Sequence, residues 1–240
     1  MKKIDTSKLP QVAPEFDVQQ MLDYGCHFGH AIKRWHPKMA EWIYAEKNGI
    51  HLFDLFKTAQ QLKHVYNYFY DLGKQNKQVI ILGTKRHAKE VVQQAAQASG
   101  MMYIASRWLG GFLTNWEQIN RSLKRMIEIE QGLESGAYVN YTKYERVQLD
   151  KERARLERFF GGIRNLKDKP DAIFVVDPKK EDNAVEEANK MGVPVVALAD
   201  TDADPSKLSL LVPANDDSKR SIELMVTTVC QAYAAGKKAK

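Results

Sequence analysis

Val79-Ile80-Ile81-Leu82-Gly83-Thr84 is the stretch that decides the fold of this 240-residue chain. Four apolar residues in an unbroken run are typical of a strand that is covered on both faces, as in a parallel sheet. Gly83 and Thr84 then lead into a predicted helix over residues 85–99. Because a strand followed directly by a helix is the building unit of parallel sheets, the stretch predicts an α/β domain.

The same alternation of strands and helices continues along the chain. Further strands are predicted over residues 101–105, 172–176, 195–199 and 208–212. Helices are predicted between or after them, over residues 181–191 and 218–235. Strands that alternate with helices indicate parallel βαβ units, so we expect a doubly wound parallel sheet.

The N-terminal part carries a different pattern, which predicts a helix and a β-hairpin. The helix is predicted over residues 15–24. Two apolar runs, residues 42–46 and 50–53, flank Asn48-Gly49, and this dipeptide favours a hairpin turn because both positions tolerate positive φ. A longer helix over residues 54–75 follows, with apolar side chains at every third or fourth position.

Residues 113–160 interrupt the α/β pattern and predict an antiparallel coiled-coil hairpin around Ser135-Gly136. Spacings of three and four, then of seven, relate a set of positions that are apolar except for the glutamate: Trp116, Ile119, Leu123, Met126, Glu130, Leu133, Leu149, Leu156 and Ile163. Residues 115–160 hold nine Lys or Arg and eight Asp or Glu, so we expect a salt-bridged arm. The α/β domain then comprises residues 1–112 and 161–240, with a basic C-terminal tail.

Composition limits the classes of function. The chain holds 36 Lys or Arg and 30 Asp or Glu, and the resulting charge of +6 is compatible with nucleic acid. Only Cys26 and Cys230 occur, which indicates a reducing compartment and no disulfide framework. No apolar run reaches the roughly 20 residues of a membrane span, and the start lacks a secretory signal. We therefore expect a cytoplasmic protein without a membrane partner.

Basic residues in predicted loops and at predicted helix starts are candidate RNA contacts. A helix start after Thr84 would offer its backbone N–H groups to a phosphate, although a solvated helix start explains these charges equally well. An aromatic side chain beside an arginine can stack on a base, but it can also fill the core. The candidate RNA-binding residues are Arg34, Lys38, Lys85, Arg86, Arg107 and Trp108.

The chain shows no signature of a catalytic, cofactor or metal site. Glycine-rich phosphate-binding patterns are absent. Cys26, His27 and His30, with His36 nearby, lack the second cysteine pair of a closed zinc site, so we expect these histidines to cap turns. The carboxyl ends of predicted strands carry acidic residues that fit either a magnesium site or Asx turns, and we favour the turns. These acidic residues are Asp177, Asp200, Asp202 and Asp204.

Seven motifs occur in a fixed order and together carry a resemblance to a known family. They are GCHFGHAIKRWHPKM (25–39), NGIHLFDLFKT (48–58), ILGTKRHA (81–88), RWLGGFLTNW (107–116), FGGI (160–163), PDAIFVVDPKKEDNAVEEANKMGVPVVALADTDADP (170–205) and VPANDD (212–217). Over about residues 18–235 the chain closely resembles the bacterial and organellar form of the second protein of the small ribosomal subunit. It departs from that pattern at His36 and at Asp202-Ala203.

The resemblance implies a flavodoxin-like sheet with an inserted coiled-coil arm. It also implies a protein that is not an enzyme and not an obligate homo-oligomer. Such a protein contacts small-subunit ribosomal RNA between head and body and supports docking of the OB-repeat protein that captures messenger RNA. Its expected location is the cytoplasmic ribosome, or that of an organellar stroma or matrix. Two alternatives remain open: a nucleotide-dependent α/β enzyme that uses Gly83 and Asp177, and a protein–protein scaffold that acts through the hairpin.

Overall fold

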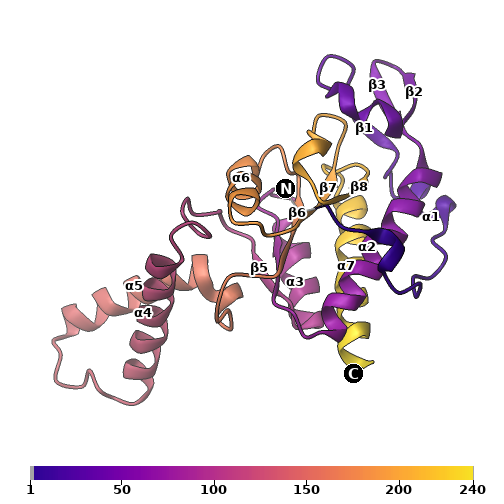
Figure 1. The fold of residues 1–240 in the computed structure, drawn as a ribbon. Helices are drawn as coiled ribbons and strands as arrows, with labels where there is room; N and C mark the ends of the chain where they lie inside the picture. The colour runs from indigo at the N-terminus through magenta and orange to yellow at the C-terminus, as the bar shows by residue number, and fades with distance from the viewer. Residues whose placement is uncertain (1–2, 240) are drawn as a thin grey trace.

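The computed structural model describes residues 3–239 and contains a five-stranded parallel sheet as its central element (Figure 1). The strands are β4 (Val79–Leu82), β5 (Met102–Ile104), β6 (Ala172–Val176), β7 (Val195–Ala199) and β8 (Leu210–Pro213), in the order β5-β4-β6-β7-β8. Counted along the sheet-forming strands alone, this order is 2-1-3-4-5, the flavodoxin-like arrangement. The predicted α/β fold is therefore confirmed.

Helices cover both faces of this sheet. One face packs against α2 (Leu55–Lys74), α3 (Lys89–Ser99) and α7 (Lys219–Lys238), and the other against α6 (Asp182–Lys190) and the start of α4 (Trp116–Glu134). Neighbouring strand residues point to opposite layers, so Ile81 enters the first core and Ile80 the second. This burial on both faces explains why the strands read as unbroken apolar runs.

The C-terminal helix is longer than the sequence predicted. It was expected to end near residue 235, before a basic tail, but α7 continues to Lys238. Glycines allow α2 and α7 to pack closely there, because a side chain at Gly73 would meet the backbone of Tyr233 and one at Gly236 would meet the backbone of Tyr70. This contact between helices stabilises the last turn of α7.

The N-terminal extension consists of α1 (Val18–Asp23) and a small antiparallel sheet. Its strands are β1 (Phe28–Ala31), β2 (Ile43–Lys47) and β3 (Ile50–Phe53), in the order β1-β3-β2. The predicted hairpin turn is confirmed, with φ of 53° at Asn48 and 79° at Gly49. Strand β1 was not predicted, because its pairing with β3 is a long-range contact that local periodicity does not show.

Within residues 3–239, four short 3-10 helices connect the larger elements. They are Thr6–Lys8, Pro37–Trp42, Gly161–Ile163 and Pro205–Lys207. The third of them lies against the edge strand β5, and a side chain at Gly162 would collide with the carbonyl oxygen of Tyr103. This glycine therefore allows the chain to cover the open edge of β5.

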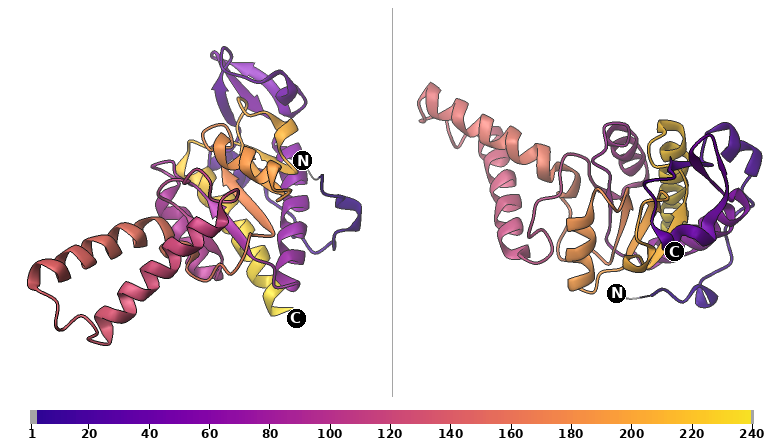
Figure 2. Two further views of the ribbon diagram at one scale, coloured as in Figure 1. Left: turned by 60° about the vertical axis from the view of Figure 1, so that its left-hand side comes forward. Right: turned by 90° about the horizontal axis from the view of Figure 1, so that it is seen from above.

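The inserted arm consists of α4 and α5 (Lys143–Phe160), which diverge toward the tip (Figure 2). The predicted spacing holds near the base, but farther out Ile129 and Gly132 are buried instead of Glu130 and Leu133. A physical reason is that the ring of Tyr138, in the connecting loop, folds back onto Gly132. Residues 143–148 are all exposed, so the predicted coiled-coil seam is wrong for the outer half of the arm.

The base of the arm belongs to the core of the α/β domain. Ile119, Leu123, Met126 and Phe160 are buried in the same cluster as the sheet residue Ile80. The predicted division at residues 113 and 160 therefore separates side chains that pack together.

A buried carboxylate holds the loop that carries the RWLGGFLTNW motif. Glu187 of α6 accepts hydrogen bonds from Trp108 Nε1 (3.2 Å) and from the backbone nitrogens of Gly111 (2.8 Å), Leu113 (3.0 Å) and Thr114 (3.3 Å). Trp108 is 6% exposed, so its indole fills the core. The Gly-Gly segment is therefore clamped to α6 through one side chain.

We predict that Glu187→Gln lowers the free energy of unfolding by about 2 kcal/mol, because hydrogen bonds to a charged acceptor contribute more than those to a neutral amide. Urea denaturation measures the difference. Glu186→Gln is the matched control, since Glu186 is the exposed neighbour on the same helix. Equal stability of the two variants would contradict the role of Glu187.

The same carboxylate predicts a pH dependence. Burial opposes its charge, but the hydrogen bonds from Gly111, Leu113, Trp108 and Thr114 outweigh burial and lower the pKa of Glu187. Its charge thus stabilises the fold above the unfolded pKa of about 4.3, and this stabilisation is lost as pH falls through the lower folded value. The difference in the free energy of unfolding between wild type and Glu187→Gln should therefore become smaller as the pH is lowered. Urea denaturation at several pH values measures it.

We also predict that the outer arm is dispensable for folding. Replacing residues 131–150 with a short Gly-Ser linker should leave one cooperative unfolding transition, because the removed segment packs only within the arm. Removing residues 114–160 should lower stability strongly, since each large buried side chain that is lost contributes roughly 2–5 kcal/mol. Loss of cooperative unfolding in the shorter deletion, monitored by circular dichroism, would show that the tip is integral to the fold.

Candidate functional site

A lysine and three aspartates fill the carboxyl edge of the sheet between β4 and β6. In flavodoxin-like folds this is the switch point at which ligands bind. Lys85 Nζ lies 2.8 Å from Asp177 Oδ2, 2.6 Å from Asp216 Oδ1 and 2.7 Å from Asp217 Oδ1. These side chains come from the loops after β4, β6 and β8, so the usual ligand crevice is occupied by the protein's own charges.

In this partly buried cluster, the pKa of each charged group depends on the charges of its neighbours. Asp216 is 1% exposed, and burial together with repulsion from Asp177 and Asp200 raises the pKa of its carboxyl well above its ordinary value. Burial alone would lower the pKa of Lys85, but the surrounding carboxylates outweigh it and raise that pKa. Lys85 therefore stays protonated and binds the three loops together.

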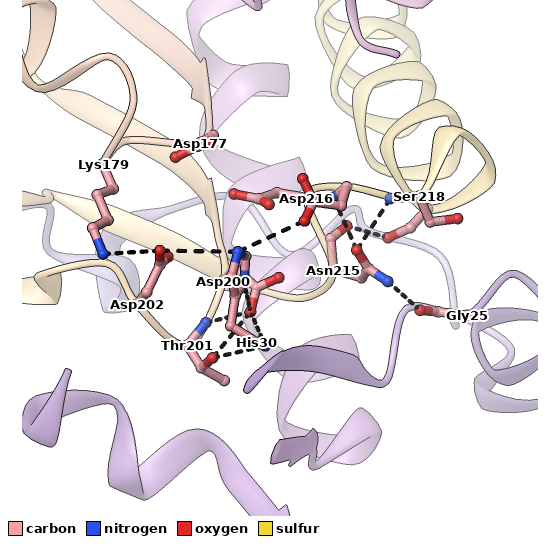
Figure 3. Close-up of polar contacts among 12 residues, drawn as sticks. Gly25, His30, Asp177, Lys179, Asp200, Thr201, Asp202, Asn215, Asp216 and Ser218 are labelled. Carbon is pink, nitrogen blue, oxygen red and sulfur yellow. Dashed lines mark hydrogen bonds and ion pairs between the residues drawn. The ribbon is translucent and has the colours of Figure 1, made fainter. Parts of the chain in front are cut away.

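His30 connects the N-terminal extension to this charged edge (Figure 3). Its Nδ1 lies 3.0 Å from Asp200 Oδ1, and its Nε2 lies 3.6 Å from Asp217 Oδ2 and 3.9 Å from Asp202 Oδ2. The hydrogen bond to Asp200 is the main cause that raises the pKa of His30 to about 9. His30, Asp216 and Asp217 each place one possible metal-ligand atom within 4.8 Å of the others.

The predicted turn-capping roles are partly confirmed. His36 Nδ1 accepts a hydrogen bond from the backbone nitrogen of Lys38 (3.2 Å), and Asp204 caps the turn at Ser206 (2.9 Å). His30 does not cap a turn with its side chain, because its ring faces the acidic residues instead. Local sequence could not show this, since Asp200 and Asp217 are about 170 residues or more away along the chain.

Three residues of this region were missed by sequence reasoning. Asp216 and Asp217 appeared only within the VPANDD motif, and no spacing rule marked them as partners of Lys85 or His30. Glu187 lies in the middle of a predicted helix, where a glutamate ordinarily faces solvent. The roles of Asp216, Asp217 and Glu187 depend on partners that are distant in sequence and come together only in the folded sheet.

Three of the predicted RNA contacts are exposed and carry no ion pair to the described part of the chain. Arg34 follows β1, Arg86 follows β4, and Arg107 follows β5. The loop of Arg34 reaches the carboxyl edge of the sheet, because the backbone nitrogen of His36 donates to the carbonyl of Thr201 (2.8 Å). Lys38 is exposed as well, but it contacts Ser206 Oγ at 2.9 Å and Asp204 Oδ1 at 3.6 Å.

The other two predicted contacts are engaged inside the protein. Lys85 lies in the charged edge described above, and Trp108 is bound to Glu187. The predicted helix start is also displaced, since α3 begins only at Lys89 and residues 85–88 form a turn. Lys85 and Arg86 are therefore loop residues rather than the first residues of a helix.

The arm is salt-bridged, as its balanced charges predicted. Arg164 lies 2.9 Å from Glu130 and 2.8 Å from Glu157, and Arg125 lies 3.3 Å from Glu152. No helix within residues 3–239 is both long and apolar enough to cross a membrane.

Two comparisons with known proteins identify the family. A family model described as ribosomal protein S2 matches residues 21–236. The small ribosomal subunit protein uS2 of Deinococcus radiodurans is 48% identical over 212 residues, which cover 88% of this chain and 80% of the relative. The chain therefore belongs to the ribosomal protein S2 family and is a structural, non-enzymatic component of the small ribosomal subunit in translation.

Proposed function

We propose that this protein binds small-subunit ribosomal RNA through the loops at the carboxyl edge of its parallel sheet. The observation that carries the proposal is the set of exposed arginines Arg34, Arg86 and Arg107, which have no carboxylate partner among residues 3–239. Guanidinium groups bind phosphate oxygens in a bidentate geometry, so unpaired arginines in neighbouring loops suit an RNA backbone.

The remaining predicted contacts have supporting roles in this proposal. Lys38 adds a fourth exposed charge next to Arg34. Lys85 fixes the loop that carries Arg86, and the buried Trp108 fixes the position of Arg107. The interface thus combines exposed cations with anchors that reach into the core.

We further propose the finer placement that the family resemblance implies. The protein lies between head and body of the small subunit on cytoplasmic ribosomes and supports docking of the OB-repeat protein that captures messenger RNA. Support for the RNA contact comes from the unpaired arginines, and support for protein neighbours comes from the arm.

The tip of the arm is suited to a protein neighbour. Val139 is 70% exposed and Tyr144 is 72% exposed, and Tyr141 and Val147 lie exposed beside them in the sequence. Apolar and aromatic side chains exposed together indicate contact with another protein. We propose that a neighbouring small-subunit protein covers these four residues.

We predict that Arg86→Glu and Arg107→Glu each weaken binding to small-subunit RNA without unfolding the protein. Each lost phosphate contact should reduce the slope of log affinity against log salt concentration by about 1. Filter binding at several KCl concentrations measures the slope, and thermal unfolding checks the fold, which such exposed changes alter by about 0.5 kcal/mol or less.

Arg146→Glu is the matched control, because it changes the net charge equally on an exposed position of the arm. It should bind RNA with the wild-type slope. Wild-type slopes for both Arg86→Glu and Arg107→Glu would refute the RNA interface, and so would an equal loss in the control.

We predict that the double substitution Tyr144→Ser, Val147→Ser leaves thermal stability unchanged and lowers occupancy in small subunits assembled in competition with wild type. The physical reason is that these side chains leave much of their surface exposed in the isolated chain and would bury it against a neighbour. Quantitative mass spectrometry of purified subunits measures the ratio. Equal incorporation of both forms would show that the tip is not an interface.

A further inference from the structure

We propose that the cavity between α3, the edge strand β5 and the end of α5 holds one unstacked nucleotide of the bound RNA. This inference rests on the proposed RNA interface and extends it toward the base of the arm. The cavity has a volume of about 590 Å³, within the ordinary range of small-ligand sites. Figure 1 shows the end of α5 beside β5, where Gly162 lies against the carbonyl of Tyr103.

The unpaired charges that line this cavity are positive. Lys89 and Arg158 are exposed and contact no carboxylate within residues 3–239. Arg153 and Glu157 also line the cavity, but each of them already has an ion-pair partner. Lys89 is also the first residue of α3, which has no side-chain cap, and an uncapped helix start favours an anion. The cavity therefore suits a phosphate group.

Arg158 offers a flat surface on which a base can stack. Its guanidinium carbon lies 4.7 Å from the centroid of the Phe159 ring, and both residues line the cavity. Bases stack on guanidinium planes as they do on aromatic rings. The contact with Phe159 orients the guanidinium before RNA binds, which reduces the conformational freedom that binding removes.

Two polar side chains of the cavity lack partners. Ser106 Oγ is buried and makes no hydrogen bond within residues 3–239. The exposed amide of Gln93 makes none in that range either. A buried hydroxyl without a partner is costly, so Ser106 indicates a ligand. A hydroxyl and an amide can each donate and accept hydrogen bonds, as the edge of a base requires.

The cavity shares its loops with the proposed RNA contacts. Ser106 directly precedes Arg107, and Lys89 directly follows the turn that carries Arg86. An RNA strand bound by these two arginines would pass the mouth of the cavity and could turn one base into it. An acidic protein segment would also satisfy the two free cations, but the guanidinium plane and the shared loops favour RNA.

Arg158→Lys in the full-length protein tests the stacked base. The variant keeps the positive charge and loses the planar guanidinium. Its affinity for small-subunit RNA should fall at least about fivefold, the loss expected for one stacked base, while the slope of log affinity against log KCl concentration stays at the wild-type value. Filter binding measures both. Arg155→Lys is the matched control, since Arg155 is exposed on the same helix and does not line the cavity.

Wild-type affinity of Arg158→Lys, or an equal loss in Arg155→Lys, would overturn the nucleotide site. The variants Arg86→Glu and Arg107→Glu test the wider interface separately. Weakened binding in those two variants beside wild-type affinity of Arg158→Lys would therefore refute the cavity alone and leave the RNA interface standing.

A photoreactive benzoylphenylalanine in place of the exposed Gln93 identifies the occupant in assembled small subunits. Irradiation should cross-link this position to RNA. Cross-links to protein alone would show that a neighbouring protein fills the cavity, and they would refute the proposal.

Discussion

The interaction on which the structure depends is the contact of Lys85 with Asp177, Asp216 and Asp217. The carboxyl ends of parallel strands bring acidic loops together, and three of these carboxylates meet where the sheet order reverses. The partly buried ammonium group of Lys85 compensates these negative charges, and without it the buried carboxylate of Asp216 would lose its partner. At the switch point, this ion cluster connects the loops after β4, β6 and β8 and fills the place where related folds bind a ligand.

This cluster also explains how the loops that we propose to contact RNA gain a defined position. Exposed arginines on long side chains lose conformational freedom when they bind, and a rigid base limits what else must be ordered. The loop of Arg86 follows Lys85 directly, and the loop of Arg107 is clamped through the neighbouring Trp108 and Glu187. The ion pair of Lys85 and the hydrogen bond of Trp108 to Glu187 therefore hold the backbone on which Arg86 and Arg107 are exposed.

Much of the fold could be predicted from sequence, because buried parallel strands leave a local signature. The run from Val79 to Leu82, the hairpin turn at Asn48-Gly49 and the existence of two arm helices all follow from short-range patterns. The sequence did not predict features that depend on long-range contacts: β1 forms through its pairing with β3, and Gly132 is buried by Tyr138.

The candidate site shows the same difference between local and long-range features. The exposed arginines were found by residue type and position in loops, whereas the roles of Lys85, Trp108, Asp216 and Glu187 depend on partners between about 70 and 130 residues away.

The cover over β5 has a consequence for the time before the protein joins a ribosome. An edge strand with free backbone groups can pair with the same edge of another molecule, which leads to aggregation. Here Gly162 brings the chain onto the carbonyl of Tyr103, and the edge strand is only three residues long. The shielded edge and the net charge of +6 both oppose such pairing between two copies of the chain. Gly162 thus limits the pairing of this edge strand with the same edge of another copy of the chain.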